Sequence, residues 1–399
     1  MMKNNLFLGL VLVSMLFSCT TDDTADIIIN DSSDNSVTNN NPTTGGGGTP
    51  TGQTIKLAGT YTENLTLDPI NTYILNGSLI MASGTTLTIP AGMTITAEAS
   101  GANVYIAISQ GAKIIANGTA AAPIVLTSAA SNPAAGNWGG LIILGKAPIN
   151  SVVAGATSTS EIASLPYGGN IADDDSGSIQ YLRVEYSGGA ADGQSENNGL
   201  SFYGVGSGTF VQYVESFEGK DDGFEFFGGT VEVSYLYAVN NQDDSIDWTE
   251  GFSGKITNAY VKHGADHDKG IEADGYNTDY SNAGAYYSKP TITNVTIDGY
   301  DAASGTAVNV RAGTQGLFNN LKISNFNLAF KMDGDAGDNP TGAGVLSNDL
   351  HITDITFTNI TTKLQNNTPE AVTEANFISN DGGGTGTDYA TWGAGWTRN

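Results

Sequence analysis

The chain has 399 residues, and its 15 lysines and arginines against 41 aspartates and glutamates give a formal net charge of −26. Binding to nucleic acid requires clustered basic residues that contact phosphates, so this charge excludes a nucleic-acid partner from the expected functions. A single cysteine excludes an intramolecular disulfide framework and any metal centre built from several cysteines.

Residues 1–18 have the features of a signal peptide for secretion. Lys3 precedes an apolar run at residues 6–13, which is too short to span a bilayer. The run leads into the segment Leu-Phe-Ser-Cys at residues 16–19, which resembles a bacterial lipobox. The resemblance implies that Cys19 is acylated and anchors the protein in a membrane. An ordinary cleavage site beside an unrelated cysteine is the alternative.

Residues 19–54 are predicted to form a lipidated N-terminus followed by a disordered linker. They contain asparagine and glycine runs and prolines, and they have no periodic apolar face. Asp22 and Asp23 lie just after the cysteine and resemble the acidic export signal of Bacteroidota surface lipoproteins. The resemblance implies a protein of the outer membrane that is exposed at the cell surface.

Residues 55–399 are predicted to form one all-β domain. Apolar residues alternate with Thr, Ser and Asn, and glycine recurs at short intervals, which is the pattern of many short strands. Seven similar segments begin at Ile179, Val211, Val233, Ile256, Ile292, Phe318 and Ile352. Their spacings are 32, 22, 23, 36, 26 and 34 residues, and the short ones equal one coil of a parallel β-helix. We therefore expect a right-handed parallel β-helix of roughly 10–13 coils, with a pair of β-sandwiches as the alternative.

A second strand is predicted in each of five successive coils, downstream of the first. Its flanking apolar residues face the core, so the residue between them is expected to face solvent. These outward residues are Ser201, Glu225, Asp247, Glu272 and Asn309. The middle three are acidic, and the stack they form is called the acidic ladder below.

More acidic residues precede each acidic rung, at 221–222, 243–244, 266 and 268. Neighbouring coils lie about 4.8 Å apart, so these carboxylates repel one another unless something compensates them. One hypothesis is a hydrated acidic face that Lys220, Lys262 and Lys269 partly neutralise.

A second hypothesis is a Ca²⁺ site, because Ca²⁺ prefers six to eight oxygen ligands. Its candidate ligands are Asp221, Asp222, Glu225, Asp243, Asp244, Asp247, Asp268 and Glu272. A third hypothesis is catalysis, since coupled carboxylates can serve as the acid and base of glycoside cleavage.

Two of the acidic segments resemble motifs of polygalacturonases. The segment Gln-Asp-Asp-Ser-Ile at 242–246 is similar to their Gln-Asp-Asp-Cys-Ile motif, and residues 221–225 are similar to their Asn-Thr-Asp-Gly-Phe-Asp motif. The resemblance implies a right-handed β-helix in which Asp222, Asp243 and Asp244 are catalytic. The Gly-His-Gly and Arg-Ile-Lys motifs of that family have no counterpart in this sequence.

A broader resemblance covers most of the chain. Residues 136–145, 175–177 and 392–397 look like segments of a family of Bacteroidota β-helix surface lipoproteins with a pectin-lyase-like fold. That resemblance implies a fold and a location but no activity. Trp392 and Trp396 are predicted to cover the open end of the helix, where a bare strand edge would promote aggregation.

Together these patterns predict a lipid-anchored surface β-helix whose acidic ladder binds Ca²⁺. We expect it to act as a binding or scaffolding module for an extracellular polysaccharide or an outer-membrane uptake complex. The alternative is a polysaccharide-degrading enzyme, a polygalacturonase-like hydrolase or a lyase. The stacked carboxylates are the feature on which both hypotheses depend.

Overall fold

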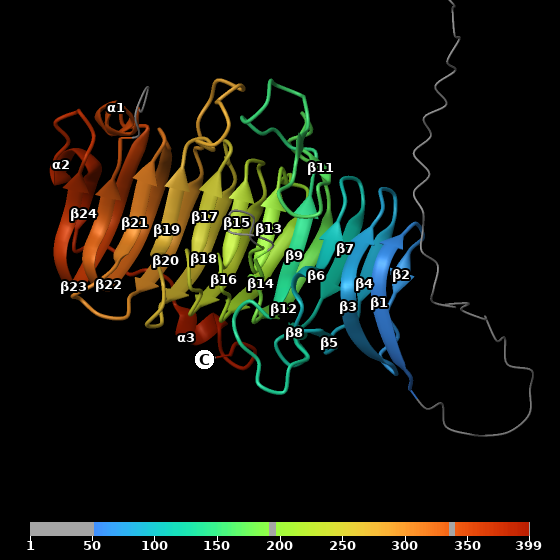
Figure 1. The fold of residues 1–399 in the computed structure, drawn as a ribbon. Coiled ribbons are helices and arrows are strands. Elements are labelled where there is room, and N and C mark those ends of the chain that lie inside the picture. The colour runs from blue at the N-terminus through green and yellow to red at the C-terminus, as the bar shows by residue number, and fades with distance from the viewer. Residues whose placement is uncertain (1–51, 191–196, 335–339, 399) are drawn as a thin grey trace, which may run out of the picture. The chain divides into compact units, whose positions relative to one another are not determined.

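The computed structural model describes residues 52–190, 197–334 and 340–398. In this part, 22 strands join one sheet whose coil-to-coil pairings are parallel, and the longest helix has six residues. The sheet winds into a coil, because each strand pairs with its equivalents in the preceding and following coils (Figure 1). The predicted parallel β-helix is confirmed. The signal peptide, Cys19 and all but the last three residues of the predicted linker lie outside the described residues.

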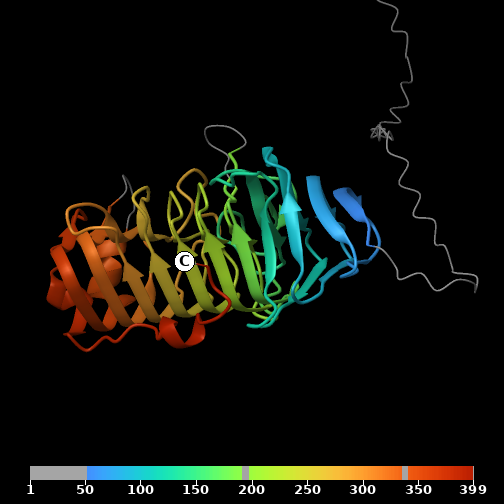
Figure 2. The same ribbon diagram turned by 90° about the horizontal axis from the view of Figure 1, so that it is seen from below.

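The strands form three strips along the helix (Figures 1 and 2). The first strip begins with β2 (Leu65–Thr66), β4 (Thr86–Ile89) and β7 (Lys113–Asn117). The second strip includes β5 (Thr94–Ala97) and β8 (Ile124–Ser128). β1 (Thr54–Tyr61) and β3 (Thr72–Met81) pass from the second strip into the third, which continues with β6 (Gly101–Ile108) and β9 (Trp138–Leu144).

Later coils have one long strand across the first two strips and a short strand in the third. The long strands are β12 (Gly177–Glu185), β14 (Phe210–Phe217), β16 (Glu232–Val239), β18 (Lys255–Lys262) and β20 (Thr291–Asp298). The short strands are β13 (Leu200–Tyr203), β15 (Phe224–Phe227), β17 (Ile246–Thr249), β19 (Lys269–Asp274) and β21 (Thr306–Arg311). β22 (Gly316–Met332) and β23 (Leu350–Asn366) cross all three strips, and β24 (Ile378–Asp381) is the last strand.

The remaining elements lie outside these strips. They are the hairpin of β10 (Ser158–Thr159) and β11 (Pro166–Tyr167), and the helices α1 (Thr341–Leu346), α2 (Glu374–Phe377) and α3 (Tyr389–Trp392). No helix among the described residues has the length and hydropathy needed to cross a membrane.

The seven similar segments of the sequence correctly predict which residues of successive coils pair with one another. Their first residues pair in succession, from Ile179 with Val211 through to Phe318 with Ile352. The long spacings contain inserted loops, as expected. One such loop follows β19. The side-chain amide of Asn150, which belongs to another insertion, donates hydrogen bonds to the carbonyl oxygens of Gly275 and Tyr286 in this loop, at 2.8 and 2.7 Å.

Inward side chains of successive coils stack into one continuous core. Phe226, for example, is fully buried and lies between Phe202 and Phe252, with ring centroids 4.9 and 4.6 Å away. Each large apolar side chain that is buried in this way contributes about 1.5–3 kcal/mol. The core is continuous along the coils because like residues occupy like positions in each one.

The bend between the first two strips is a single residue with a left-handed backbone. Seven coils carry it, with φ between 48° and 61°, at Tyr181, Tyr213, Tyr235, Asn258, Asn294, Asn320 and Asp354. Asparagine and aspartate tolerate this conformation better than tyrosine does. The rings of Tyr181, Tyr213 and Tyr235 stack on one another, with centroids 4.4 and 4.3 Å apart.

The predicted position of the C-terminal tryptophans is wrong. Trp396 packs edge-to-face on Tyr181 and Tyr213, and Trp392 packs on Tyr235, so both lie on the flank of β12, β14 and β16. At the C-terminal end of the helix, α2 instead packs against β23 and β24. The tryptophans lie on the flank because the tyrosines there present ring edges that an indole face can cover.

Candidate functional site

Three columns of polar side chains run across β15, β17 and β19 at the start of the third strip. The ladder residues pair in register, Ser201 with Glu225, Glu225 with Asp247, Asp247 with Glu272 and Glu272 with Asn309. The same register places residues 222, 244 and 269 in a second column and residues 221, 243 and 268 in a third. The acidic ladder predicted from the sequence is therefore a stack in space.

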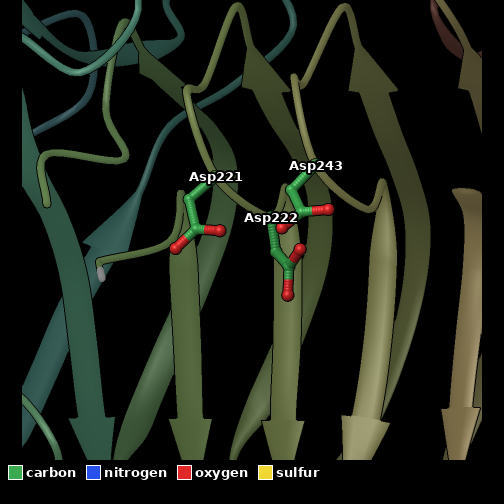
Figure 3. Close-up of side chains that lie close together, drawn as sticks. All are labelled: Asp221, Asp222 and Asp243. Carbon is green, nitrogen blue, oxygen red and sulfur yellow. The ribbon is translucent and has the colours of Figure 1, made fainter. Parts of the chain in front are cut away.

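All eight predicted metal-ligating residues line one cavity of about 240 Å³. Glu161, Asn198 and Lys269 complete its lining. Figure 3 shows three of the carboxylates, Asp221 and Asp222 from the turn before β15 and Asp243 from the turn before β17, lying side by side. The cavity, called the acidic groove below, also contains the three residues predicted to be catalytic.

Asp222 and Asp244 each use one oxygen to hold the next coil. Oδ1 of Asp222 accepts the backbone N–H of Asp244 at 2.9 Å, and Oδ1 of Asp244 accepts that of Lys269 at 2.7 Å. Each bond therefore joins neighbouring residues of the second column. These two aspartates are fixed in position by the turns that they stabilise.

Only the C-terminal side of the acidic groove is neutralised by basic side chains. Nζ of Lys269 lies 2.8 Å from Oε1 of Glu272, 2.5 Å from Oδ2 of Asp268 and 3.5 Å from Oδ2 of Asp244. Arg311 pairs with Glu272 and with Asp274. Burial lowers the pKa of Lys269, but the charges of Asp244 and Glu272 outweigh this and raise it overall, so Lys269 stays cationic.

Among the described residues, no basic side chain forms an ion pair with Glu225 or Asp247, although the charge of Arg311 acts on Asp247 at longer range. Glu225 accepts a hydrogen bond of 2.5 Å from the amide of Asn198, whereas Oδ1 of Asp247 is buried and accepts none among the described residues. Burial raises the pKa of Asp247 well above its usual value, and the charges of Glu225 and Glu272 raise it further.

Three further carboxyls of the second column and the ladder behave alike. Burial first, and then neighbouring carboxylates, raise the pKa values of Asp222, Glu225 and Asp244 well above their ordinary range. Burial, and after it the stacking of like charges at the coil spacing, therefore favours the protonated form of these three carboxyls.

Two expectations for this face need correction. The ladder residues are less exposed than expected, since Ser201, Glu272 and Asn309 are only 3%, 6% and 2% exposed and Glu225 and Asp247 are half-buried. Of the three lysines expected to neutralise this face, Lys269 lines the groove, whereas Lys220 and Lys262 are not part of its lining.

Glu161, Asn198 and Arg311 were not predicted as site residues. Asn198 could have been predicted by extending the second column by one coil toward the N-terminus. Arg311 could have been predicted because it pairs with Asp274 in the register between β19 and β21. Glu161 belongs to an insertion that shares no pattern with the coils. The sequence contained no signal that would place it beside the ladder.

The fold and the groove define a β-helix protein with a polar site on one face. The profile of the pectate-lyase-like β-helix domain family matches residues 59–397, so the chain belongs to this family. The predicted pectin-lyase-like fold is confirmed. A search among curated proteins found no match.

Three matching solved structures are catalytic domains of a GH87 alpha-1,3-glucanase, one in complex with nigerose and two with an aspartate changed to alanine, bound to nigerose or tetrasaccharides. Each is 13% identical to this chain, with TM-scores of 0.35, 0.34 and 0.33. The match covers 83% of this chain and 64% of the glucanase chain. At these TM-scores the similarity adds nothing to the description of the site.

Replacing Asp247 with asparagine should stabilise the protein in the presence of a chelator. The folded-state pKa of Asp247 lies above its unfolded value, so its contribution to stability is present at low pH and is lost as pH rises through the folded-state pKa. At neutral pH the variant removes this penalty, and its amide can donate to the adjacent carboxylates. We expect the free energy of unfolding to rise by about 1–3 kcal/mol, measured by urea denaturation.

Asp266→Asn is the matched control, because it removes one negative charge at an exposed position of the same region. It should change stability by less than about 0.5 kcal/mol. Equal stabilisation by both variants would mean that net charge, rather than stacking in the groove, causes the effect.

Proposed function

We propose that this protein is a surface-exposed, lipid-anchored β-helix whose acidic groove binds Ca²⁺ and presents a binding surface to an extracellular polysaccharide or an outer-membrane uptake complex. One observation carries the proposal. Nine carboxylates, the eight predicted ligands and Glu161, line a single cavity that contains one lysine, and Oδ1 of Asp247 is buried there with no hydrogen bond from any described residue.

The spacing of the carboxylate oxygens suits calcium. Four overlapping groups of three side chains each bring one oxygen per residue within 4.8 Å of the others. The groups are 221, 222 and 243; 222, 225 and 247; 243, 244 and 268; and 244, 247 and 272. Ligands on opposite sides of a Ca²⁺ ion are about 4.6–5.2 Å apart, so these oxygens can share an ion with little rearrangement.

Calcium is preferred to magnesium for two physical reasons. Mg²⁺ demands near-octahedral geometry at about 2.0–2.1 Å and retains several waters, whereas Ca²⁺ accepts irregular shells of carboxylates. The groove supplies many carboxylates whose positions follow the coil spacing rather than an octahedron. A divalent cation near Asp247 would also replace mutual repulsion by attraction to one central charge.

Calcium should stabilise the folded protein. Free Ca²⁺ at about 100 times its Kd raises the free energy of unfolding by about 2.7 kcal/mol, because the ion binds the folded state alone. The measurement is the thermal midpoint in Ca²⁺, in Mg²⁺ and in chelator, together with titration calorimetry. Asp247→Asn should lose most of the calcium response, and Asp266→Asn should retain it. A midpoint that is the same in Ca²⁺ and in chelator would contradict the proposal.

Hydrolysis of a polysaccharide is the second candidate function. It is favoured by the raised pKa values of Asp222 and Asp244, since a proton-bearing carboxyl can act as a general acid. The Asp-Asp turns at 221–222 and 243–244 bring further carboxylates to the same cavity. Such a pairing of acid and base is what glycoside cleavage requires.

For the hydrolase, Asp244→Asn should lower the release of reducing ends from an acidic polysaccharide by at least about 100-fold. The asparagine retains an oxygen that can accept the Lys269 N–H, so the turn should stay folded. Reducing-end assays on a panel of neutral and acidic polysaccharides measure the effect, with Asp266→Asn as the control. A wild-type protein that cleaves no member of the panel would remove this candidate.

The anchor in the proposal depends on Cys19. Changing Cys19 to serine should abolish incorporation of a labelled fatty acid, because serine lacks the thiol that the lipid chain modifies. The variant protein should also leave the detergent phase in a detergent–water partition, which the wild-type protein should enter. Labelling of the serine variant equal to that of the wild type would contradict acylation at this residue.

A further inference from the structure

The segment that follows β24 runs back along the flank of the helix instead of ending beside the last coil (Figure 2). We call residues 382–398 the strap. Near its start, the backbone N–H groups of Thr385 and Gly386 donate to Oδ1 of Asn320 at 2.6 and 3.2 Å. The N–H of Thr387 then donates to Oγ1 of Thr296 at 3.1 Å. Further on, the strap reaches β18, β16, β14 and β12 in turn.

The kind of contact that the strap makes with the coils depends on which residue forms the bend between the first two strips. In three coils the bends are asparagines that bond to one another, Asn294 donating to Asn258 at 3.1 Å and Asn320 donating to Asn294 at 2.7 Å. In the three preceding coils the bends are tyrosines. Their rings stack on one another and leave a row of edges that the strap covers with Trp392 and Trp396.

The aromatic contacts of the strap lie outside the main core. Tyr389 stacks on Tyr260 at 4.5 Å and, with Trp392, packs against a small separate cluster that includes Tyr237 and Phe217. The strap contributes no strand to the sheet. Among the described residues, the strap makes one backbone–backbone hydrogen bond with an earlier coil, from the Gly382 N–H to the Ile355 carbonyl oxygen at 2.6 Å, and it adds no residue to the main core.

The end of the strap is held by the contacts of Arg398 with Glu215 and Glu185, which we call the latch. The Arg398 N–H lies 3.0 Å from both carboxylate oxygens of Glu215, which is fully buried. The Arg398 guanidinium bonds Glu185 at 2.8 Å and lies over the ring of Phe217. Arg183 donates to the Trp396 carbonyl oxygen at 3.1 Å. A single N–H thus serves both oxygens of Glu215.

We propose that the strap is a releasable lock on the tyrosine-bearing coils, and that its latch at Glu215 weakens as pH rises. The strap is separable because it adds neither a strand nor a part of the main core. The latch is sensitive because the fully buried carboxyl at its centre accepts one backbone N–H and, within the part of the chain that the structure describes, no bond from a guanidinium. Release uncovers the edges of Tyr181, Tyr213 and Tyr235.

The direction of the pH effect follows from the surroundings of Glu215. The groups that face it are Arg183 and Glu185 of β12, Tyr237 of β16 and Arg398 of the strap, and Tyr237 is hydrogen-bonded in turn to Tyr389 of the strap. Burial raises the pKa of Glu215 to about 8, although the Arg398 N–H and Arg183 oppose this rise. With the strap released, the carboxyl regains water and its pKa falls toward about 4.3. At pH values between about 4.3 and about 8, docking of the strap is therefore coupled to the uptake of a proton by Glu215.

Acrylamide quenching of tryptophan fluorescence tests the proposal on the full chain. Trp138 and Trp248 are buried in the main core, so the increase in quenching reports Trp392 and Trp396. The opening equilibrium should rise by up to about tenfold per pH unit from about pH 5 and level off above about pH 8. We expect quenching to increase at least about twofold over this range, while the far-ultraviolet circular dichroism of the coils stays unchanged. Tyrosine ionisation does not interfere, since the pKa of Tyr213 is raised to about 12.

Glu215→Gln is the decisive variant, because glutamine still accepts the Arg398 N–H but does not ionise. Its quenching should stay low at every pH in the range. Glu232→Gln is the control, since Glu232 is exposed and paired with Lys255 at 2.6 Å, and it should retain the wild-type pH dependence.

Wild-type quenching that is flat with pH, or a pH dependence that survives in Glu215→Gln, would overturn the latch. Loss of circular dichroism in step with quenching would overturn the claim that the strap is released separately from the coils.

Discussion

In-register pairing between successive coils is the constraint on which the rest of this structure depends. A strand at the coil spacing of about 4.8 Å places each side chain above the equivalent residue of the preceding coil. The phenylalanine core, the tyrosine and asparagine bends and the acidic ladder are all consequences of this one arrangement. For apolar, aromatic and amide side chains the arrangement is favourable, because like groups pack or bond with like.

For carboxylates the same arrangement is unfavourable, and the protein compensates it unevenly. Lys269 and Arg311 neutralise the ladder around Glu272, whereas Asp247 has a buried oxygen to which no described residue donates a hydrogen bond. Solenoid stability is approximately a sum over coils and their interfaces, so a local penalty of this kind is tolerated if the neighbouring coils are stable. The well-packed phenylalanines directly beneath the ladder supply that stability.

The sequence was sufficient to predict the coil register and the columns of the groove. Both follow from short-range patterns, such as the apolar residues on either side of Glu225, that repeat from one coil to the next. Glu161 could not be predicted because its insertion has no counterpart in other coils. The position of Trp396 was mispredicted because its partners lie about 200 residues earlier in the chain, where Tyr181 looks like an ordinary strand residue. The burial of the ladder also depends on such long-range packing.

The path of the strap has a consequence for the order of folding. The hydrogen bond between Arg398 and Glu185 joins residues 213 positions apart in the sequence. Closing so large a loop is entropically costly unless the intervening chain is already compact. The seat of the strap also exists only when all the coils between β12 and β23 have stacked. The strap is therefore expected to dock last during folding, and its docking marks a coil stack without a missing or misaligned turn.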